Sequence, residues 1–212
     1  MGTIKQGILG GFSGKVGTVV GGTWKGIHYM RSLPASVRNP RTVPQVTQRT
    51  KFLVTIEFLK PITPFVREGF KAYSNKQSAF NAAMSYNVTN AVTGSFPDFE
   101  VDYPNAMVSR GSLLQAQGAI ATAGTDSITF TWSDNSGVSN ALATDKAMPM
   151  IYNTNKGEAV FNTAAADRST ETIDLSIPDG WSGDPIEVYL GFISEDGSLV
   201  ANSVYLGQQT IA

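Results

Sequence analysis

The chain has 212 residues, 42% of them hydrophobic, which is enough to build one large domain or two small ones around a real core. It contains no cysteine, which excludes disulfides, zinc–thiolate sites and thiol catalysis. The net charge of −1 hides a strong segregation: residues 1–76 hold 12 of the 16 Lys and Arg but only two of the 17 Asp and Glu. This pattern predicts contact with an acidic partner or with a second copy of the chain, basic part to acidic part.

No apolar run approaches 18 residues, so the sequence predicts no transmembrane helix. The N-terminal residues also lack the unbroken apolar stretch of a Sec signal peptide. We therefore expect a protein that is made in the cytoplasm without a signal peptide. A virion-like particle and an extracellular assembly are its alternative destinations.

The first segment, residues 1–40, is glycine-rich and basic. Nine of the 21 glycines fall in its first 26 positions, interleaved with apolar side chains. Since each interior glycine costs a helix about 1 kcal/mol relative to alanine, we predict an extended arm or hairpin, with strands at 15–20 and 23–32 joined by a Gly21-Gly22 turn. Such an arm needs a surface to lie on. A neighbouring subunit and the chain's own helices are the two alternatives.

The second segment, residues 41–105, is predicted to be helical. Apolar residues recur there at helical spacing, and a capping-box-like run opens the segment. The expected helices run from about residue 42 to the Pro61 break, from Thr63 to about Tyr73, and from Ser78 to Thr93. Because these helices are short, packing against other elements must stabilise them.

The third segment, residues 106–212, alternates apolar and polar residues as β-strands do, for example at Ile128, Phe130 and Trp132. Seven strands are expected: 113–121, 126–133, 146–153, 158–162, 171–177, 185–193 and 199–207. Seven short strands in about 100 residues predict an antiparallel β-sandwich that resembles a fibronectin type III or immunoglobulin-like module. The fold class is therefore α+β: a glycine-rich β arm, a short helical segment and a sandwich.

Candidate catalytic groups are few. The single histidine, His28, lies in a strand-like stretch without acidic neighbours, which favours a structural or solvent-facing role over a catalytic triad or a metal ligand. The run GGFSGK departs from a phosphate loop in its spacing and in the residue after the lysine. Three carboxylates alternate at Asp98, Glu100 and Asp102. A solvated or partner-binding edge is favoured for them over a calcium site. The sequence thus predicts no enzymatic activity and no cofactor.

The tryptophans and arginines suggest roles in the core and in contacts. Trp132 is expected in the core, and Trp181 is expected to plug one end of the sandwich rather than stack on a sugar. Arginines gather between Arg31 and Arg49, and guanidinium groups suit bidentate contact with carboxylate or phosphate. Nucleic acid is not favoured, because no nucleic-acid-binding fold is recognisable and the acidic half would repel it. Carboxylates of a second copy are the preferred partners.

Several runs carry a family resemblance. GGFSGKVGTVVGG, NPRTVPQVTQRTKFLVTIEFLKP and FNAAMSYNVTNAVTGSFPDFEVDY are similar to a bacterial family of about 210 residues that is classed as a domain of unknown function. That family has no assigned activity, so the resemblance implies no catalytic residue. The NPRT-x-x-Q-x-x-QR run, Asn39 to Arg49, resembles a motif of phage-type virion proteins, which implies a structural role in an assembly.

Two functions from different classes follow as expectations. The first is a non-enzymatic structural protein that self-assembles into a homo-oligomer (a filament, tube or phage-like particle component) by head-to-tail charge complementarity and its N-terminal arm. The alternative is an adhesion module whose sandwich displays loops for a carbohydrate or a receptor. The residues expected to carry assembly are Val16, Val19, Trp24, Ile27, Tyr29, Arg31, Arg38, Arg41 and Arg49.

Overall fold

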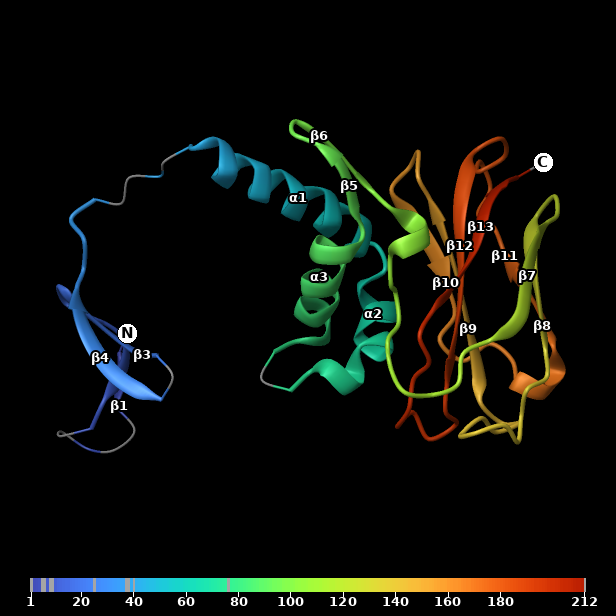
Figure 1. Ribbon diagram of the computed structural model, residues 1–212, viewed down its shortest axis with the longest axis horizontal. Helices are drawn as coiled ribbons and strands as arrows, with labels where there is room; N and C mark the ends of the chain where they lie inside the picture. The colour runs from blue at the N-terminus through green and yellow to red at the C-terminus, as the bar shows by residue number, and fades with distance from the viewer. Residues whose placement is uncertain are drawn as a thin grey trace. The chain divides into compact units, whose positions relative to one another are not determined.

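The chain folds as two units, residues 1–42 and residues 43–212, in the computed structural model (Figure 1). We call them the N-terminal unit and the body. The structure describes residues 2–4, 7, 10–24, 26–36, 39, 41–75 and 77–211. The division lies close to the boundary predicted after residue 40. No division falls near the boundary predicted after residue 105, because one hydrophobic cluster joins the helices to the sandwich.

The N-terminal unit is a four-stranded antiparallel sheet in the order β1-β2-β3-β4. Its strands are β1 (Thr3–Ile4), β2 (Phe12–Val16), β3 (Val19–Trp24) and β4 (Ile27–Ser32). The predicted turn at Gly21-Gly22 is wrong, since both glycines lie inside β3 and the chain turns after Val16 instead. Gly17 occupies that turn with a φ of +58°, a conformation that glycine adopts at little steric cost.

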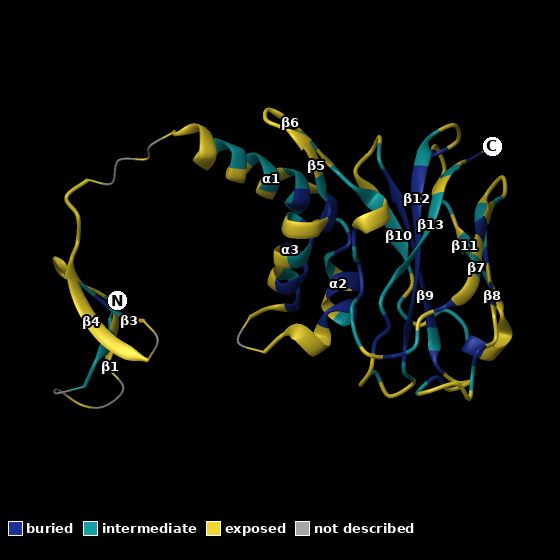
Figure 2. Ribbon diagram, in the orientation of Figure 1, coloured by how far each residue is buried: buried dark blue, intermediate teal, exposed yellow. Residues whose placement is uncertain are grey.

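Gly21 does not form a turn but allows the chain at Phe12 to pack closely against β3. A side-chain carbon at this position would lie 2.2 Å from the backbone oxygen of Phe12 and 2.5 Å from the Phe12 ring. Gly21 is also the one buried residue among those that the structure describes in residues 1–42. Figure 2 accordingly shows these strands mostly in the colours of exposed and intermediate residues. The described part of the N-terminal unit has regular strands but no hydrophobic core.

The body begins with a helical layer. It consists of α1 (Val43–Leu59), α2 (Thr63–Gly69) and α3 (Ala79–Asn90), with a short 3₁₀ helix at Lys71–Tyr73 after α2. Pro64 stands in the first turn of α2, where a missing N–H costs no hydrogen bond. Ser78 caps α3, because its hydroxyl accepts a 3.1 Å hydrogen bond from the backbone N–H of Asn81. No helix among the described residues is long and apolar enough to cross a membrane.

The third helix ends earlier than predicted. α3 stops at Asn90, whereas the sequence indicated a helix to residue 93. The next residues form β5 (Val92–Ser95), which pairs with β6 (Asp98–Val101) as an antiparallel hairpin. Val92 and Thr93 are β-branched and favour the extended conformation, so strand pairing wins over one more helical turn.

The rest of the body is a sandwich of seven strands, as predicted. They are β7 (Gln117–Ala123), β8 (Ser127–Ser133), β9 (Lys146–Asn153), β10 (Glu158–Phe161), β11 (Thr172–Ser176), β12 (Pro185–Ile193) and β13 (Val204–Thr210). They form two antiparallel sheets, β11-β8-β7 and β10-β9-β12-β13. Three antiparallel strands face four, so the prediction of an α+β fold with a β-sandwich is confirmed. Trp132 is buried, with its ring edge-on to Phe192 at 5.6 Å.

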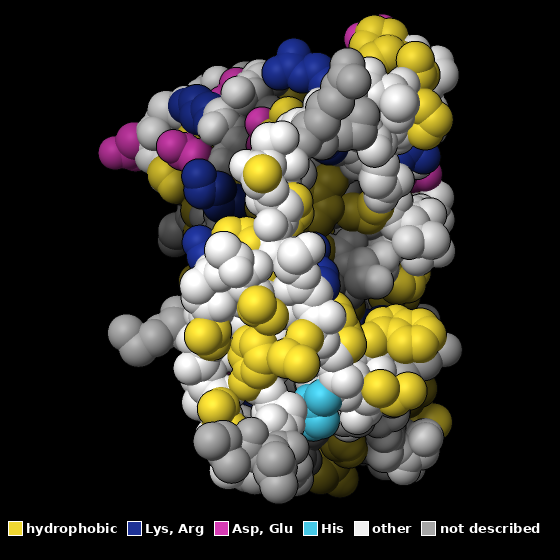
Figure 3. Space-filling model, turned by 90° about the vertical axis from the view of Figure 1, so that its left-hand side faces the viewer, with side chains coloured by type: hydrophobic (Ala, Val, Ile, Leu, Met, Phe, Trp, Pro, Cys, Tyr) yellow, Lys and Arg dark blue, Asp and Glu magenta, His cyan; other side chains and the backbone are white. Residues whose placement is uncertain are grey.

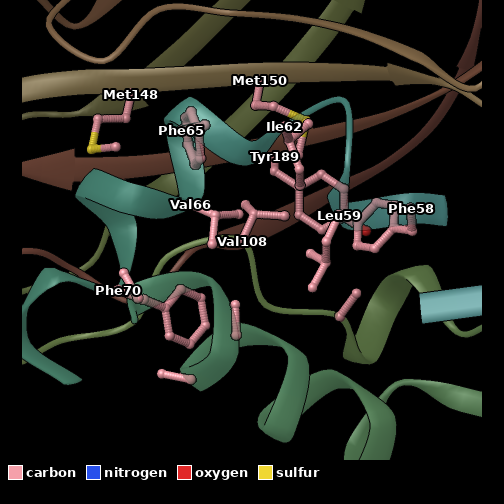
Figure 4. Packing of buried hydrophobic residues seen from close by; sticks show 14 of the residues in the cluster. Phe58, Leu59, Ile62, Phe65, Val66, Phe70, Val108, Met148, Met150 and Tyr189 are labelled. Carbon is pink, nitrogen blue, oxygen red and sulfur yellow. The ribbon is translucent and has the colours of Figure 1, made fainter. Parts of the chain in front are cut away.

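The body has three layers: helices, the four-stranded sheet and the three-stranded sheet (Figure 1). One core lies between the two sheets and includes Phe130, Trp132 and Phe192. A second core lies between the four-stranded sheet and the helices. Figure 4 shows Phe65 and Val66 of α2 gathered there with residues of β9 and β12. The strands β9 and β12 are therefore buried on both faces.

Candidate functional site

The strand register sorts the side chains of the N-terminal sheet onto two faces. The cross-strand pairs Trp24–Ile27 and Gly22–Tyr29 lie on one face, together with Arg31, which pairs with Val20. Lys15 joins this face because it also pairs with Val20, from the other side. We call the surface formed by Lys15, Val20, Trp24, Ile27, Tyr29 and Arg31 the basic-aromatic face.

The opposite face is largely apolar and also carries the Thr23–His28 pair. Val16 pairs with Val19, and Ile4 pairs with Phe12. Met30 lies on the same face, opposite Gly21. No Lys, Arg, Asp or Glu lies on this face among the residues that the structure describes. We call this surface, formed by Ile4, Phe12, Val16, Val19 and Met30, the uncharged face.

Large apolar side chains are exposed on both faces of this sheet. The exposed fraction is 64% for Trp24, 66% for Ile27 and 71% for Met30. Figure 3 shows hydrophobic side chains gathered on the surface of the N-terminal unit near the chain's single histidine. Single exposed apolar residues are ordinary, but a group of them over one small sheet marks an interaction surface.

The nine residues expected to carry assembly do not form one site. Six of them lie on the N-terminal sheet, but Val16 and Val19 are on the uncharged face while the other four are on the basic-aromatic face. Arg38 lies outside the described residues, and Arg41 is exposed just before α1. Arg49 lies on α1 and thus belongs to the body. The register of the strands, which the sequence did not reveal, decides this grouping.

Comparison of the sequence with known families gives a match over residues 11–207, which includes β2 to β4 and nearly all of the body. The match is to a family of unknown function, DUF6266. The chain belongs to this family. The expected resemblance to an uncharacterised domain family is thus confirmed. No curated protein matches the chain, and no solved structure does so either.

In this member of DUF6266, the residues that could act in catalysis or bind a phosphate or a metal ion do not gather in one place. His28 is exposed on β4, with Nδ1 3.0 Å from the hydroxyl of Thr23. Gly14 and Lys15 of the GGFSGK run lie in strand β2 and not in a loop that could enclose a phosphate. Asp98 and Glu100 are exposed on β6. Within the described residues, no group of three His, Cys, Asp or Glu is placed to hold a metal ion.

The two tryptophans of the sandwich are buried, so neither lies at the surface where a sugar could stack on it. Trp181 is 2% exposed and packs in the core between the two sheets, so it plugs the sandwich as predicted. Trp132 is buried in the same core, and its Nε1 donates a 2.7 Å hydrogen bond to the backbone oxygen of Arg168. Neither side chain can offer its ring face to a sugar.

Arg168 is a buried cation that the sequence analysis missed. Its Nε donates to Asp145 at 3.1 Å, and its two terminal nitrogens donate to Asn135 and to the backbone oxygen of Leu114. The guanidinium also lies 3.9 Å from the centre of the Phe192 ring. Burial lowers the pKa of Arg168, and the neighbouring Asp145 opposes that shift. These contacts join three loops at one end of the sandwich, so we assign this group a structural role.

Two of the surface depressions are bordered by α1. One, of about 660 Å³, brings Glu57 of α1 and Lys60, which follows that helix, near Tyr152 and Lys156. The other, of about 530 Å³, lies between α1 and α3 and is lined by largely apolar residues that include Phe52. The first suits a small polar molecule and the second an apolar side chain.

Proposed function

We propose that the protein is a non-enzymatic structural subunit that self-assembles into a homo-oligomer, such as a filament, a tube or a component of a particle. The observation that carries this proposal is the N-terminal sheet, which exposes large apolar side chains on both faces and buries a single glycine among its described residues. A sheet normally buries at least one face against another layer. The missing layer in this proposal is a second subunit.

The side chains on the sheet are of the types that dominate protein interfaces. Tryptophan, tyrosine and arginine are enriched among the residues whose truncation weakens binding most. Trp24, Tyr29 and Arg31 share the basic-aromatic face. Burying each large apolar side chain there would stabilise a complex by roughly 1.5–3 kcal/mol before the cost of association is subtracted.

The charges of the two units favour a copy of the same chain as the partner. Residues 1–42 contain six basic and no acidic residues, whereas residues 43–212 contain ten basic and 17 acidic residues. Each chain therefore carries both a basic unit and an acidic body. Complementary surfaces of this kind steer association and select the partner.

The resemblance of residues 39–49 to a motif of phage-type virion proteins supports the same proposal. In this chain the motif spans the junction between the two units, from the end of the N-terminal unit into α1. A structural role fits the dispersal of the chemical groups, since His28 lies on an exposed strand without a carboxylate among its described hydrogen-bond partners.

Size-exclusion chromatography with light scattering, together with negative-stain microscopy, tests this proposal. We expect the full chain to form oligomers at low salt. Deletion of residues 2–42 should give a folded monomer, because both cores lie wholly within the body. Raising the salt from about 0.05 to 1 M should weaken the oligomers, since exposed charges are screened beyond about 8 Å at ~0.15 M. A full chain that stays monomeric at high concentration and low salt would contradict the proposal.

A further inference from the structure

The outer face of the three-stranded sheet of the body is largely exposed. The inward residues of β7, β8 and β11 enter the core between the sheets, and their neighbours along each strand point outward. The outward residues are polar, and most are Ser or Thr, except for Ile120, which is 61% exposed. In the order of the strands they are Gln117, Ile120, Thr122, Ser127, Thr129, Thr131, Ser133, Thr172, Asp174 and Ser176. We call this set the open face.

The charged residues on the open face, and those next to β8 and β11 in the chain, are acidic. Asp174 stands on β11, where its Oδ1 accepts a 2.6 Å hydrogen bond from the hydroxyl of Thr129. Asp126 precedes β8, Asp134 follows it, and Glu171 precedes β11, and all three are exposed. The segments 117–134 and 171–177, which hold these strands and turns, contain no Lys or Arg.

We propose that the basic-aromatic face of the N-terminal sheet docks on the open face of a second copy of this chain. This inference rests on the proposed function and adds the surface that receives the N-terminal unit. Charge identifies the occupant. Lys15 and Arg31 are the charged side chains that the register places on the basic-aromatic face, whereas Asp174 is the one that it places on the open face. Each side also offers apolar contact, from Trp24, Ile27 and Tyr29 on the donor and from Ile120 on the acceptor.

The dimensions of the two surfaces agree. At about 3.3 Å per residue, the six residues of β3 and of β4 span roughly 20 Å, and the seven residues of β8 span roughly 23 Å. The Ser and Thr side chains of the open face are short, so a second sheet can approach it closely. Stacked sheets pack about 10 Å apart, and aligned packing fits two surfaces of this length.

The order of the layers in the body makes the proposed contact a head-to-tail one. The N-terminal unit is attached at Val43, the first residue of α1, in the helical layer. The open face belongs to the third layer, on the opposite side of the four-stranded sheet (Figure 1). Each subunit thus receives a neighbour on the side of the body away from its own point of attachment. A contact between two different surfaces that does not close into a ring repeats as an open filament.

Substitution of the open face tests the contact. Ile120→Lys places a cation where the basic donor should dock, and Leu142→Lys is the matched control, because Leu142 is 60% exposed and lies outside the open face. We expect Ile120→Lys to weaken self-association roughly tenfold or more. Leu142→Lys should behave as the unaltered chain. Asp174→Lys should weaken association as well, and combining it with Arg31→Asp should restore part of the loss.

A mixing experiment tests the head-to-tail geometry. The full chain with Ile120→Lys keeps its donor and loses its acceptor. The body alone, residues 43–212, keeps its acceptor and has no donor. Each should be a monomer by light scattering, and the mixture should give a discrete 1:1 complex. The control is the body alone with the Ile120→Lys substitution, which should not bind the full chain that carries the same substitution.

The outcomes separate this inference from the proposed function. If the unaltered chain assembles, the body alone does not, and Ile120→Lys assembles as well as the unaltered chain, then the N-terminal unit docks elsewhere and the inference is wrong while the proposed function stands. If the Ile120→Lys chain and the body fail to form the 1:1 complex, the open face is not the acceptor. A monomeric unaltered chain overturns both.

Discussion

The N-terminal unit and the body make regular strands in opposite ways. In the body, strands bury apolar side chains on one or both faces, and two cores result. In the N-terminal unit, glycines let strands lie very close together, while the large side chains remain exposed. Backbone pairing can therefore build a sheet whose side chains stay available for another molecule. Within the unit, such a sheet lacks the burial that a core would supply.

Two tryptophans give the largest contrast between the units. Trp181→Ala removes a side chain that is 2% exposed in the core between the sheets and should lower the free energy of unfolding of the body by roughly 3–5 kcal/mol. Trp24→Ala removes one that is 64% exposed and should change that free energy by less than about 0.5 kcal/mol. Urea denaturation of both variants measures the difference. Equal effects would mean that the N-terminal unit and the body unfold as one.

Gly21→Ala tests whether close packing holds the N-terminal sheet together. The added carbon would meet the backbone oxygen of Phe12, which cannot move without shifting β2, so we expect local destabilisation of about 1–3 kcal/mol. Amide hydrogen exchange should become faster in β2 and β3 and stay unchanged in the body. Gly22→Ala is the matched control: its added carbon meets the Tyr29 ring at 3.0 Å, and a side chain can rotate away. Slow exchange in β2 and β3 of Gly21→Ala would argue against this role of Gly21.

Lowering the pH should give the smallest contrast between the two units. Only the body can be affected through its carboxylates, because residues 1–42 contain no carboxylate side chain. In the body, hydrogen bonds from Ser194 and Ser198 lower the pKa of Asp196 to about 2. This lowered pKa means that the stabilisation is present above the unfolded value of about 3.8 and is lost as pH falls through about 2. Ser194→Ala should raise the pKa of Asp196 towards 3.8 in an NMR titration of the side-chain carboxyl. A value that stays at about 2 would assign the shift to Ser198 instead.

The sequence predicted the body well because periodicity reports burial directly. Ile128, Phe130 and Trp132 alternate with polar residues, and all three are buried between the sheets. The end of α3 was less predictable, since the choice between helix and strand near Val92 depends on β6, which lies further along the chain. Local propensity cannot report a pairing of this kind.

The candidate site was predicted only as a set of residues. The sequence indicated that Val19 and Trp24 are available for contact, and both are exposed. It could not place them on opposite faces, because the face of a residue depends on the register, and the register depends on where the chain turns. The open face could not be predicted for another reason: the alternation in β8 shows only that Thr129 points away from the core, and it is the pairing of the strands that brings Thr129 opposite Asp174.

The burial of β9 and β12 on both faces has an evolutionary consequence. A substitution in those strands disturbs one of the two cores, so their sequence has little freedom to vary. The outward positions of β8 and β11 touch neither core, and they can change without loss of the fold. Selection can therefore alter the surface chemistry of the three-stranded sheet with little effect on the stability of the fold.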